Sequence, residues 1–478
     1  NLLICLLAGS AVMYTLPLHA ATSVVANNAL PQGGQSLTGN HEIPVLNPGD
    51  LEMTIKQDGA NGIIKWNEFN VGGSATVNFE GNVNGYNTLN YVNGGNMSQI
   101  YGTINANNNG NIYIVNPAGV QIGNSAQINV GSLHVSNKKF SEEELNAVNA
   151  NTTVNAFMQG GALTNAELMS LGNINITNIE NGNVTFEGNR IVIDTERIKN
   201  DNNEKLAAEK IIVNTSNEKN VVIGYEAYDE TIDATTGEAI GYAGANANGK
   251  GNEIAMVNGE EFTKADGYMW VEDVEQLQAI NTNLGGNYAL RNSIDATGTE
   301  QGGFTAIGFY DNQLDNAFKG KFDGIDYNIF GLNIDGNTKD YVGLFGVTDG
   351  AVINNVTLVG GSISGGSDVG AIVGYANNTT ISNVVNSASV TGEAEVGGIV
   401  GTAINSTITN AVNTGKIESV GETLEDGSTL SNVGGLVGYM SGSNLDGNSY
   451  NLGDVSGKGY NVRRVSWSCR KFHYWRRY

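Results

Sequence analysis

Short apolar runs separated by glycine and asparagine cover most of the chain, and one of them recurs four times. Each copy begins with Val-Gly and ends on a glycine four or five positions later, and successive copies start 27, 27 and 37 residues apart. A period of this length predicts a solenoid, because one repeat cannot bury its apolar face alone and each coil must cover the next. The copies begin at Val342, Val369, Val396 and Val433, and a second apolar phrase follows each, at Ile353, Ile381, Ile408 and Leu445.

Residues 22–135 form a second region of short apolar runs, which predicts further β-coils. Within it, Pro117 fixes φ at a corner and Gly119 permits a positive φ, so the phrase predicts a turn between two buried strands. The apolar runs contain Ile100, Ile104, Ile112, Ile114, Ile122, Ile128 and Val130.

The region between them, residues 136–265, predicts a decorated continuation of the coils. Ser141 followed by three glutamates predicts a capping box and a short helix, and residues 184–188 and 191–193 predict strands. Residues 226–251 predict a loop. Further on, the apolar spacing of Val274, Leu277 and Ile280 predicts a short helix that caps a new coil stack.

Composition supports a strand-rich rod outside the cytoplasm. Glycine supplies 65 of 478 residues. All five prolines precede residue 118, so every later residue keeps the backbone N–H that pairing between strands requires. The net charge is −24 although the last 18 residues carry six Lys or Arg and no acid. This acidity disfavours nucleic acid and anionic membrane surfaces as partners.

The ordered phrases of residues 22–135 resemble the haemagglutination-activity, or secretion, domain of filamentous-haemagglutinin-type exoproteins of Gram-negative bacteria. The resemblance implies a right-handed parallel β-helix that an outer-membrane β-barrel transporter recognises in two-partner secretion. The family's Asn-Pro-Asn-Gly-Ile turn, here the expected secretion motif, matches Asn116, Pro117, Gly119 and Val120, and Ala118 departs from it. The resemblance places Trp66, Phe69, Asn90, Gly95, Ser98, Gln99, Gly102, Gly123 and Gly131 in the core of that domain.

Residues 266–478 resemble the glycine-rich GLUG repeats, with their usual lead-in at Tyr268–Ile280, Tyr288–Asp295 and Phe304–Gly308. Similar repeats occur in bacterial surface adhesins, and beside zinc-protease domains that cut immunoglobulins, as spacers or binding surfaces. The motif glycines are Gly343, Gly346, Gly370, Gly374, Gly397, Gly398, Gly401, Gly434, Gly435 and Gly438.

These patterns divide the chain into an expected series of segments. The series is a partial signal peptide (1–20), the secretion domain (21–135), a β-helix extension and linker (136–262), the lead-in (263–340), the repeats (341–460) and a tail (461–478). The apolar run at residues 2–8 is too short to span a bilayer. Cys5 lies in the expected signal peptide and Cys469 in the tail, and the rest of the chain has no cysteine. A chain without disulfide-closed loops is suited to pass unfolded through a narrow pore.

The tail differs from everything before it. Val462 stands where a fifth repeat is due, and reading one base later converts Trp codons, and CGG Arg codons, to glycine, which restores the repeat phrase. We therefore expect an out-of-frame translation of a fifth repeat. The alternative is a basic, aromatic patch that binds membrane or nucleic acid.

The expected function is that of a secreted or surface-exposed filamentous adhesin, not an enzyme, with a host-cell or glycan ligand. It has no expected cofactor: His41 lacks the second histidine of a zincin, and Asp335–Asp340 lacks the EF-hand spacing of a calcium site. The alternative is a β-helix carbohydrate-active enzyme, or the non-catalytic part of a larger secreted hydrolase. Tyrosines beside the repeats either stack sugar rings or pack in the ladder, and they are Tyr341, Tyr375, Tyr439 and Tyr450.

Overall fold

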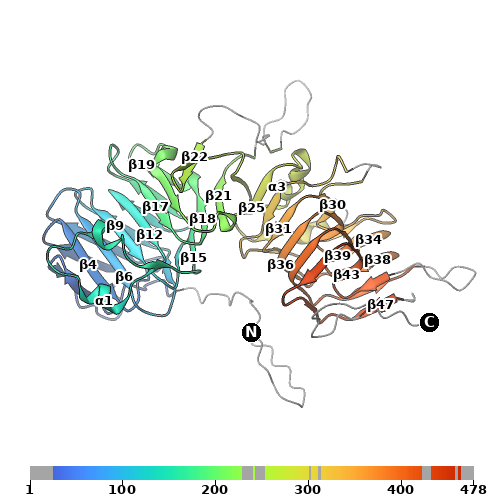
Figure 1. The fold of residues 1–478 in the computed structure, drawn as a ribbon, viewed down its shortest axis with the longest axis horizontal. Coiled ribbons are helices and arrows are strands. Elements are labelled where there is room, and N and C mark those ends of the chain that lie inside the picture. Colours follow the sequence, from blue (N-terminus) through green and yellow to red (C-terminus); the bar gives the residue numbers. More distant parts are fainter. Residues whose placement is uncertain are drawn as a thin grey trace, which may run out of the picture.

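The fold is known from a computed structural model and is an elongated stack of coils. The structure describes residues 25–228, 241–242, 253–300, 303–310, 314–421, 432–457 and 461–463. The expected signal segment, most of the expected loop at 226–251 and the tail from residue 464 lie outside the described residues. Strands lie side by side along the long axis, from β4 at one end to β43 (Val437–Ser441) at the other (Figure 1).

From the coil of β5 (Thr76–Gly81) onward, a complete coil of the amino-terminal part has three strands, one in each of three sheets. The first sheet contains β3 (Glu52–Gln57), β5 (Thr76–Gly81), β8 (Thr103–Ala106), β11 (Gln127–Val130), β16 (Asn173–Ile176) and β19 (Ile198–Asn200). The second contains β4 (Asn61–Trp66), β6 (Asn87–Val92), β9 (Asn111–Val115), β12 (Ser132–Ser136), β17 (Val184–Glu187), β20 (Ile211–Asn214) and β22 (Glu253–Val257). The third begins with β7 (Ser98–Ile100), β10 (Val120–Ile122), β15 (Glu167–Ser170), β18 (Arg190–Asp194) and β21 (Val221–Tyr225).

Successive coils pair in parallel, so the predicted all-β β-helix is confirmed. Alternation along each strand sends one set of side chains inward. In the second sheet Ile112, Leu133, Val184 and Ile211 are in register in four consecutive coils, and all are buried. These stacked aliphatic side chains form one continuous core along the axis.

The amino-terminal edge of the stack is covered by antiparallel strands. Strand β1 (Gln35–Thr38) pairs with β4, and β2 (His41–Glu42) pairs with β3. They occupy the edge groups of the first coil, which would otherwise be free to pair with another chain.

The third sheet continues past residue 262 without interruption. It runs through β24 (Tyr268–Val271), β25 (Asn287–Leu290), β27 (Lys321–Asp323), β31 (Val352–Asn354), β36 (Thr380–Asn386) and β40 (Thr407–Asn413). Helix α3 (Val274–Ala279) is present as predicted, with Leu277 buried, but the prediction that it caps a new stack is wrong. Strand β24 pairs with both β21 and β25, so one stack continues through this region.

A buried polar cluster joins the amino-terminal coils to the coils that begin at β24. Asp194 of β18 accepts hydrogen bonds from Trp270 Nε1 at 3.0 Å and from Arg291 Nε at 2.9 Å. Burial raises the pKa of Asp194, and Arg291 opposes that effect. Since a buried carboxylate without such partners would be costly, the cluster fixes the coil of β18 to the coils of β24 and β25.

The two central coils of the repeats have four strands each. One coil contains β34 (Ser367–Gly370), β35 (Val373–Asn377), β36 and β37 (Ser389–Gly392), and the next contains β38 (Ala394–Gly397), β39 (Val400–Ile404), β40 and β41 (Ile417–Ser419). The recurring phrases are in register, since the valines that begin them pair in sequence order and Ile353, Ile381, Ile408 and Leu445 do the same.

The last described strand continues this register. In β47 (Asn461–Arg463), Val462 pairs with Val433 and Arg463 pairs with Gly434 of β42 (Asn432–Gly434). An arginine thus stands at a position that glycine occupies in the preceding coils, and the expected frame change in residues 461–478 stays a prediction.

The repeat glycines allow chain segments to approach closely. At each of the ten motif glycines an added Cβ would come within 3.0 Å of another heavy atom. At Gly370, for example, it would lie 2.5 Å from the amide nitrogen of Gly401 in the next coil. Side chains at these positions would force neighbouring coils apart.

We expect Gly102→Ala to destabilise the protein by roughly 1–3 kcal/mol through overpacking, because its Cβ would meet the carbonyl oxygens of Gly72 and Ala75 at 2.2 and 2.3 Å. Gly95→Ala is the matched control, since a Cβ there meets nothing within 4 Å. Urea denaturation followed by circular dichroism measures both changes, and equal stability of the two variants would contradict the packing argument.

Candidate functional site

The residues expected in the secretion-domain core lie inside the amino-terminal coils with one exception. Trp66 packs edge-on against Phe69 at 5.7 Å, and its Nε1 donates to Asn90 Oδ1 at 3.0 Å. Ser98, Gln99, Gly102, Gly123 and Gly131 are buried as well. Gly95 is exposed in the turn before β7, so its assignment to the core is wrong.

The expected secretion motif, residues 116–120, forms a corner between β9 and β10. Asn116 is fully buried: its Nδ2 donates to Asn96 O and Ser98 Oγ, each at 2.9 Å, and its Oδ1 accepts from Ala118 N at 2.9 Å. Gly119 has φ +105°, and its amide donates to Asn116 O at 2.9 Å, which closes the turn. The turn predicted from Asn116, Pro117 and Gly119 is therefore present.

This corner offers little side-chain surface to a partner. Only Pro117 and Ala118 are partly exposed, whereas Asn116, Gly119 and Val120 are buried. The Pro117 carbonyl also accepts a hydrogen bond from Thr164 Oγ1 at 2.8 Å, which ties the corner to the segment before β15. The motif thus holds the backbone of one corner in place, and side-chain recognition there is limited to Pro117 and Ala118.

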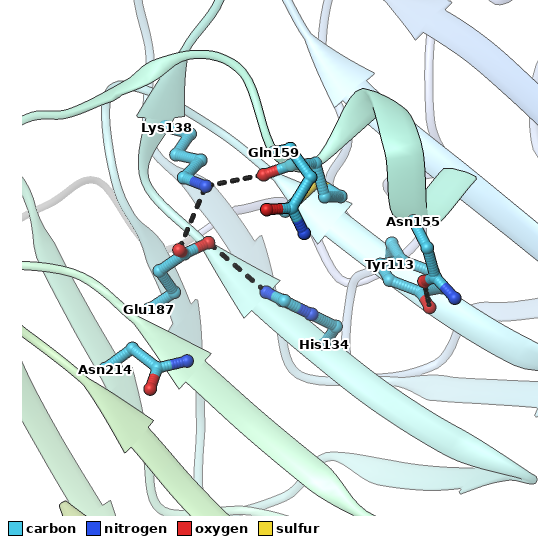
Figure 2. A pocket seen from close by; sticks show the side chains of 8 residues that line it. Tyr113, His134, Lys138, Asn155, Gln159, Glu187 and Asn214 are labelled. Carbon is cyan, nitrogen blue, oxygen red and sulfur yellow. Dashed lines mark hydrogen bonds and ion pairs between the residues drawn. The ribbon is translucent and has the colours of Figure 1, made fainter. Parts of the chain in front are cut away.

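A polar pocket of about 260 Å³ lies nearby on the outer face of the second sheet (Figure 2). An insertion between β12 and β15 covers this face with helices α1 (Glu142–Asn146) and α2 (Val154–Phe157). Helix α1 has the predicted capping box of Ser141 and Glu144. The insertion is held by an apolar cluster that contains Tyr91, Val115, Phe140, Leu145, Val154, Phe157 and Met158.

The pocket is built on outward-facing positions of parallel strands. Tyr113 of β9 and His134 of β12 are paired in register, and their rings stack at 5.2 Å. Tyr113 Oη donates to Asn155 Oδ1 of α2 at 2.8 Å. Gln159 and Asn214 also line the pocket, so with Asn155 three of its seven polar side chains are neutral amides.

One carboxylate and two basic side chains meet in the pocket. Lys138 Nζ lies 3.0 Å from Glu187 Oε1 and donates to Met158 O at 2.6 Å, while His134 Nε2 lies 3.4 Å from Glu187 Oε2 without hydrogen-bond geometry (Figure 2). Burial acts to raise the pKa of Glu187, but His134 and Lys138 outweigh it and the net pKa is lowered. Glu187 is therefore ionised at neutral pH and joins the insertion to β17.

The chemistry of the pocket is polar recognition and attachment of the insertion. Its carboxylate forms an ion pair with Lys138, and its tyrosine hydroxyl already donates to an amide, so the set does not form an activated nucleophile. In the described part of the chain no three His, Cys, Asp or Glu side chains are grouped to hold a metal ion. None of the helices described is long and apolar enough to cross a membrane.

Sequence reasoning did not single out this pocket. Tyr113 and His134 each stand between two buried aliphatic residues in strands one coil apart. This common position in the alternating pattern could have predicted that the two side chains share the outer face of the sheet. Lys138 and Glu187 belong to different coils, 49 positions apart, and nothing in the local pattern joins them.

Comparison with known families gives one match, to the TPS secretion domain, over residues 30–272. This match is longer than the resemblance found at residues 22–135 and includes the insertion, the pocket and β24.

Two curated relatives and one solved structure are similar over parts of the chain. Halomucin of Haloquadratum walsbyi is 37% identical over 129 residues, 25% of this chain and 1% of that protein. Heme/hemopexin-binding protein of Haemophilus influenzae is 27% identical over 182 residues, 38% of this chain and 19% of that protein. The chain thus spans less than a fifth of either relative. The HMW1 secretion domain from Haemophilus influenzae aligns over 87% of this chain and 83% of its own, with 15% identity and a TM-score of 0.25.

We expect Asn116→Ala to lower the free energy of unfolding by about 1–3 kcal/mol, since it leaves the buried Ser98 hydroxyl and the Asn96 carbonyl without their donor. Ala118→Ser at the partly exposed position of the same turn should change stability little. Urea denaturation compares the two, and an Asn116→Ala protein as stable as the parent would show that the corner does not depend on this side chain.

We expect Glu187→Gln to destabilise the protein at pH 7, because the lowered pKa means that the folded state stabilises the carboxylate. That stabilisation is present above the ordinary pKa of glutamate and is lost as the pH falls through the lowered folded-state value. The stability difference between variant and parent should therefore shrink on acidification. Glu142→Gln is the control, since this side chain is 71% exposed and its ion pair with Lys65 is 4.0 Å long, and it should change the stability at pH 7 little.

Proposed function

The chain belongs to the TPS secretion domain family, and on that premise we propose that it is an exported, rod-shaped exoprotein of a Gram-negative bacterium. Residues 30–272 direct the chain to an outer-membrane β-barrel transporter, and the coils that follow present an attachment surface outside the cell. The observation that carries the proposal is the family match over half of the chain.

The construction of the rod supports export as an unfolded chain. Each coil pairs with its neighbours through parallel strands, so the fold can form coil by coil once the chain has left the pore. Residues 6–468 contain no cysteine, and no disulfide can close a loop there before transport. Folding outside the cell then opposes return of the chain.

The repeats support a role in attachment. They extend the stack beyond the secretion domain through one continuous sheet, which holds their surface away from the amino-terminal coils (Figure 1). Several aromatic side chains of the lead-in and the repeats are exposed, among them Phe309, Tyr310 and Tyr439. Exposed aromatic rings on a rigid scaffold favour binding over a purely structural spacer. We propose attachment to host cells or to other bacteria.

Export tests the first part of the proposal. We expect a passenger fused to residues 1–272, behind a functional signal peptide, to reach the medium only when the cognate transporter is co-expressed. Immunoblots of medium and cells measure this, and a transporter variant with a blocked pore is the control. Equal export without the transporter would refute the proposed route. Asn116→Ala in the same fusion should reduce export and leave synthesis unchanged.

A further inference from the structure

Two columns of side chains run side by side along one face of the repeats. The first column is the residue before each Val-Gly phrase: Tyr341, Asp368, Glu395 and Asn432. The second column comes from the sheet of β35, β39 and β43, where Tyr375, Thr402 and Tyr439 are paired in register. A residue of the first column lies beside the second-column residue of the next coil. The rings of Tyr341 and Tyr375, for example, are 5.8 Å apart.

Aromatic rings of this face remain open to solvent. Tyr310 is 42% exposed and lies 5.3 Å from Tyr341, which extends the row to three neighbouring rings. Tyr439 is 45% exposed and stands two coils beyond Tyr375, a distance of about 10 Å at the usual spacing of strands. Thr402 interrupts the row between them, so these tyrosines do not form a closed packing ladder. Tyr450 lies in the third sheet, beside Val412, and is not part of the row.

Carboxylates lie among these rings without cations. Burial and the neighbouring Glu395 and Asp340 together raise the pKa of Asp368 to about 6, and the Thr402 hydroxyl opposes this effect. Burial likewise raises the pKa of Glu395, although Asn432 Nδ2 donates to its Oε1 at 3.2 Å. Among the described residues no lysine or arginine forms an ion pair with either acid. Such a group of partly buried acids is costly to the fold, and solvation by a ligand's donors would relieve it.

The same positions carry backbone strain. Tyr341, Asp368 and Glu395 have positive φ angles of 62°, 57° and 48° in three consecutive coils. A bulky tyrosine is rare in this region of φ, and such strain is concentrated at ligand-binding positions.

A buried hydroxyl on the same face lies beside one of the carboxylates. Thr402 is 5% exposed, and its hydroxyl interacts with the Asp368 carboxylate and lowers the pKa of that group. A carboxylate has several acceptor positions, so Asp368 can still accept from a ligand that lies across it and Tyr439.

We propose that this tyrosine–carboxylate strip, formed by Tyr310, Tyr341, Tyr375, Asp368, Glu395 and Tyr439, binds a linear polysaccharide that is uncharged or carries amino groups. Sugar rings lie against the tyrosine rings, and sugar hydroxyl or amino groups donate to the two carboxylates, which can only accept when ionised. The acids exclude anionic polysaccharides by repulsion.

A peptide fits this face less well than a sugar does. A strand-like peptide gains affinity from main-chain hydrogen bonds at a free sheet edge. Here β35 and β39 are already paired with the coils on either side, so recognition at Tyr375 and Thr402 must come from side chains. Strand β43, which carries Tyr439, is the last described strand of its sheet. The inference rests on the proposed attachment role, and it is tested on purified protein so that a failure of export leaves the result intact.

The test measures binding of chito-oligosaccharides, cello-oligosaccharides, chitosan oligomers and heparin to the purified full chain by titration calorimetry. We expect at least one of the first three to bind and heparin not to bind. Tyr439→Ala and Tyr375→Ala should each weaken binding about tenfold, a factor that corresponds to about 1.4 kcal/mol. Phe330→Ala in β28 (Asn328–Phe330), with the wild-type ring 39% exposed away from the strip, is the matched control and should bind as the parent does.

Circular dichroism establishes that each variant is folded, and the exposed Tyr439 carries the test if Tyr375→Ala unfolds. Asp368→Asn provides a second readout, because it should weaken binding while it removes a partly buried carboxylate that has no cation beside it and leaves the fold intact. Absence of binding to all three uncharged or amino-bearing sugars would overturn the proposal. Undiminished binding by Tyr439→Ala, or binding of polylysine in place of any sugar, would overturn it as well.

Discussion

The fold depends on the close approach of successive coils. Parallel backbone pairing satisfies the strand N–H and C=O groups only if neighbouring coils stay one strand spacing apart over the whole stack. Glycine makes this possible at the tightest points, such as Gly131, where an added Cβ would lie 2.0 Å from the carbonyl oxygen of Asn109. Inside this frame the aliphatic side chains stack in register, as Ile381 does on Ile408, so backbone pairing and apolar burial support each other.

Much of this architecture was predictable from the sequence because it repeats. The spacing of the Val-Gly phrases predicted the register of the repeats, and the resemblance of the amino-terminal phrases predicted the β-helix that the third sheet now shows. When a pattern repeats, each copy is independent evidence for the same contact between neighbouring coils. Single features gave less: α3 was predicted correctly as a helix, but its place between two paired strands depends on pairing that no local pattern encodes.

The candidate sites were less predictable for the same reason. Asn116 was singled out, yet its burial follows from contacts with Asn96 and Ser98 of the preceding coil. The pocket of His134 and Glu187 needs an insertion of about 30 residues to close over the sheet. The tyrosine–carboxylate strip joins residues of different coils, and the sequence left two readings of its tyrosines open. Register resolves which tyrosines share a face, because Tyr375 and Tyr439 occupy equivalent positions and Tyr450 does not.

The antiparallel strands β1 and β2 give the stack a direction. They block one edge of the first coil, so further coils can add only at the opposite edge. A chain that emerges with its amino end first would therefore wind from that end, and each new coil would become the template for the next. On the proposed export route such winding would act as a ratchet, because each completed coil would oppose return of the chain. Movement in one direction would then need no nucleotide hydrolysis outside the cell, only the sequential gain in pairing and burial.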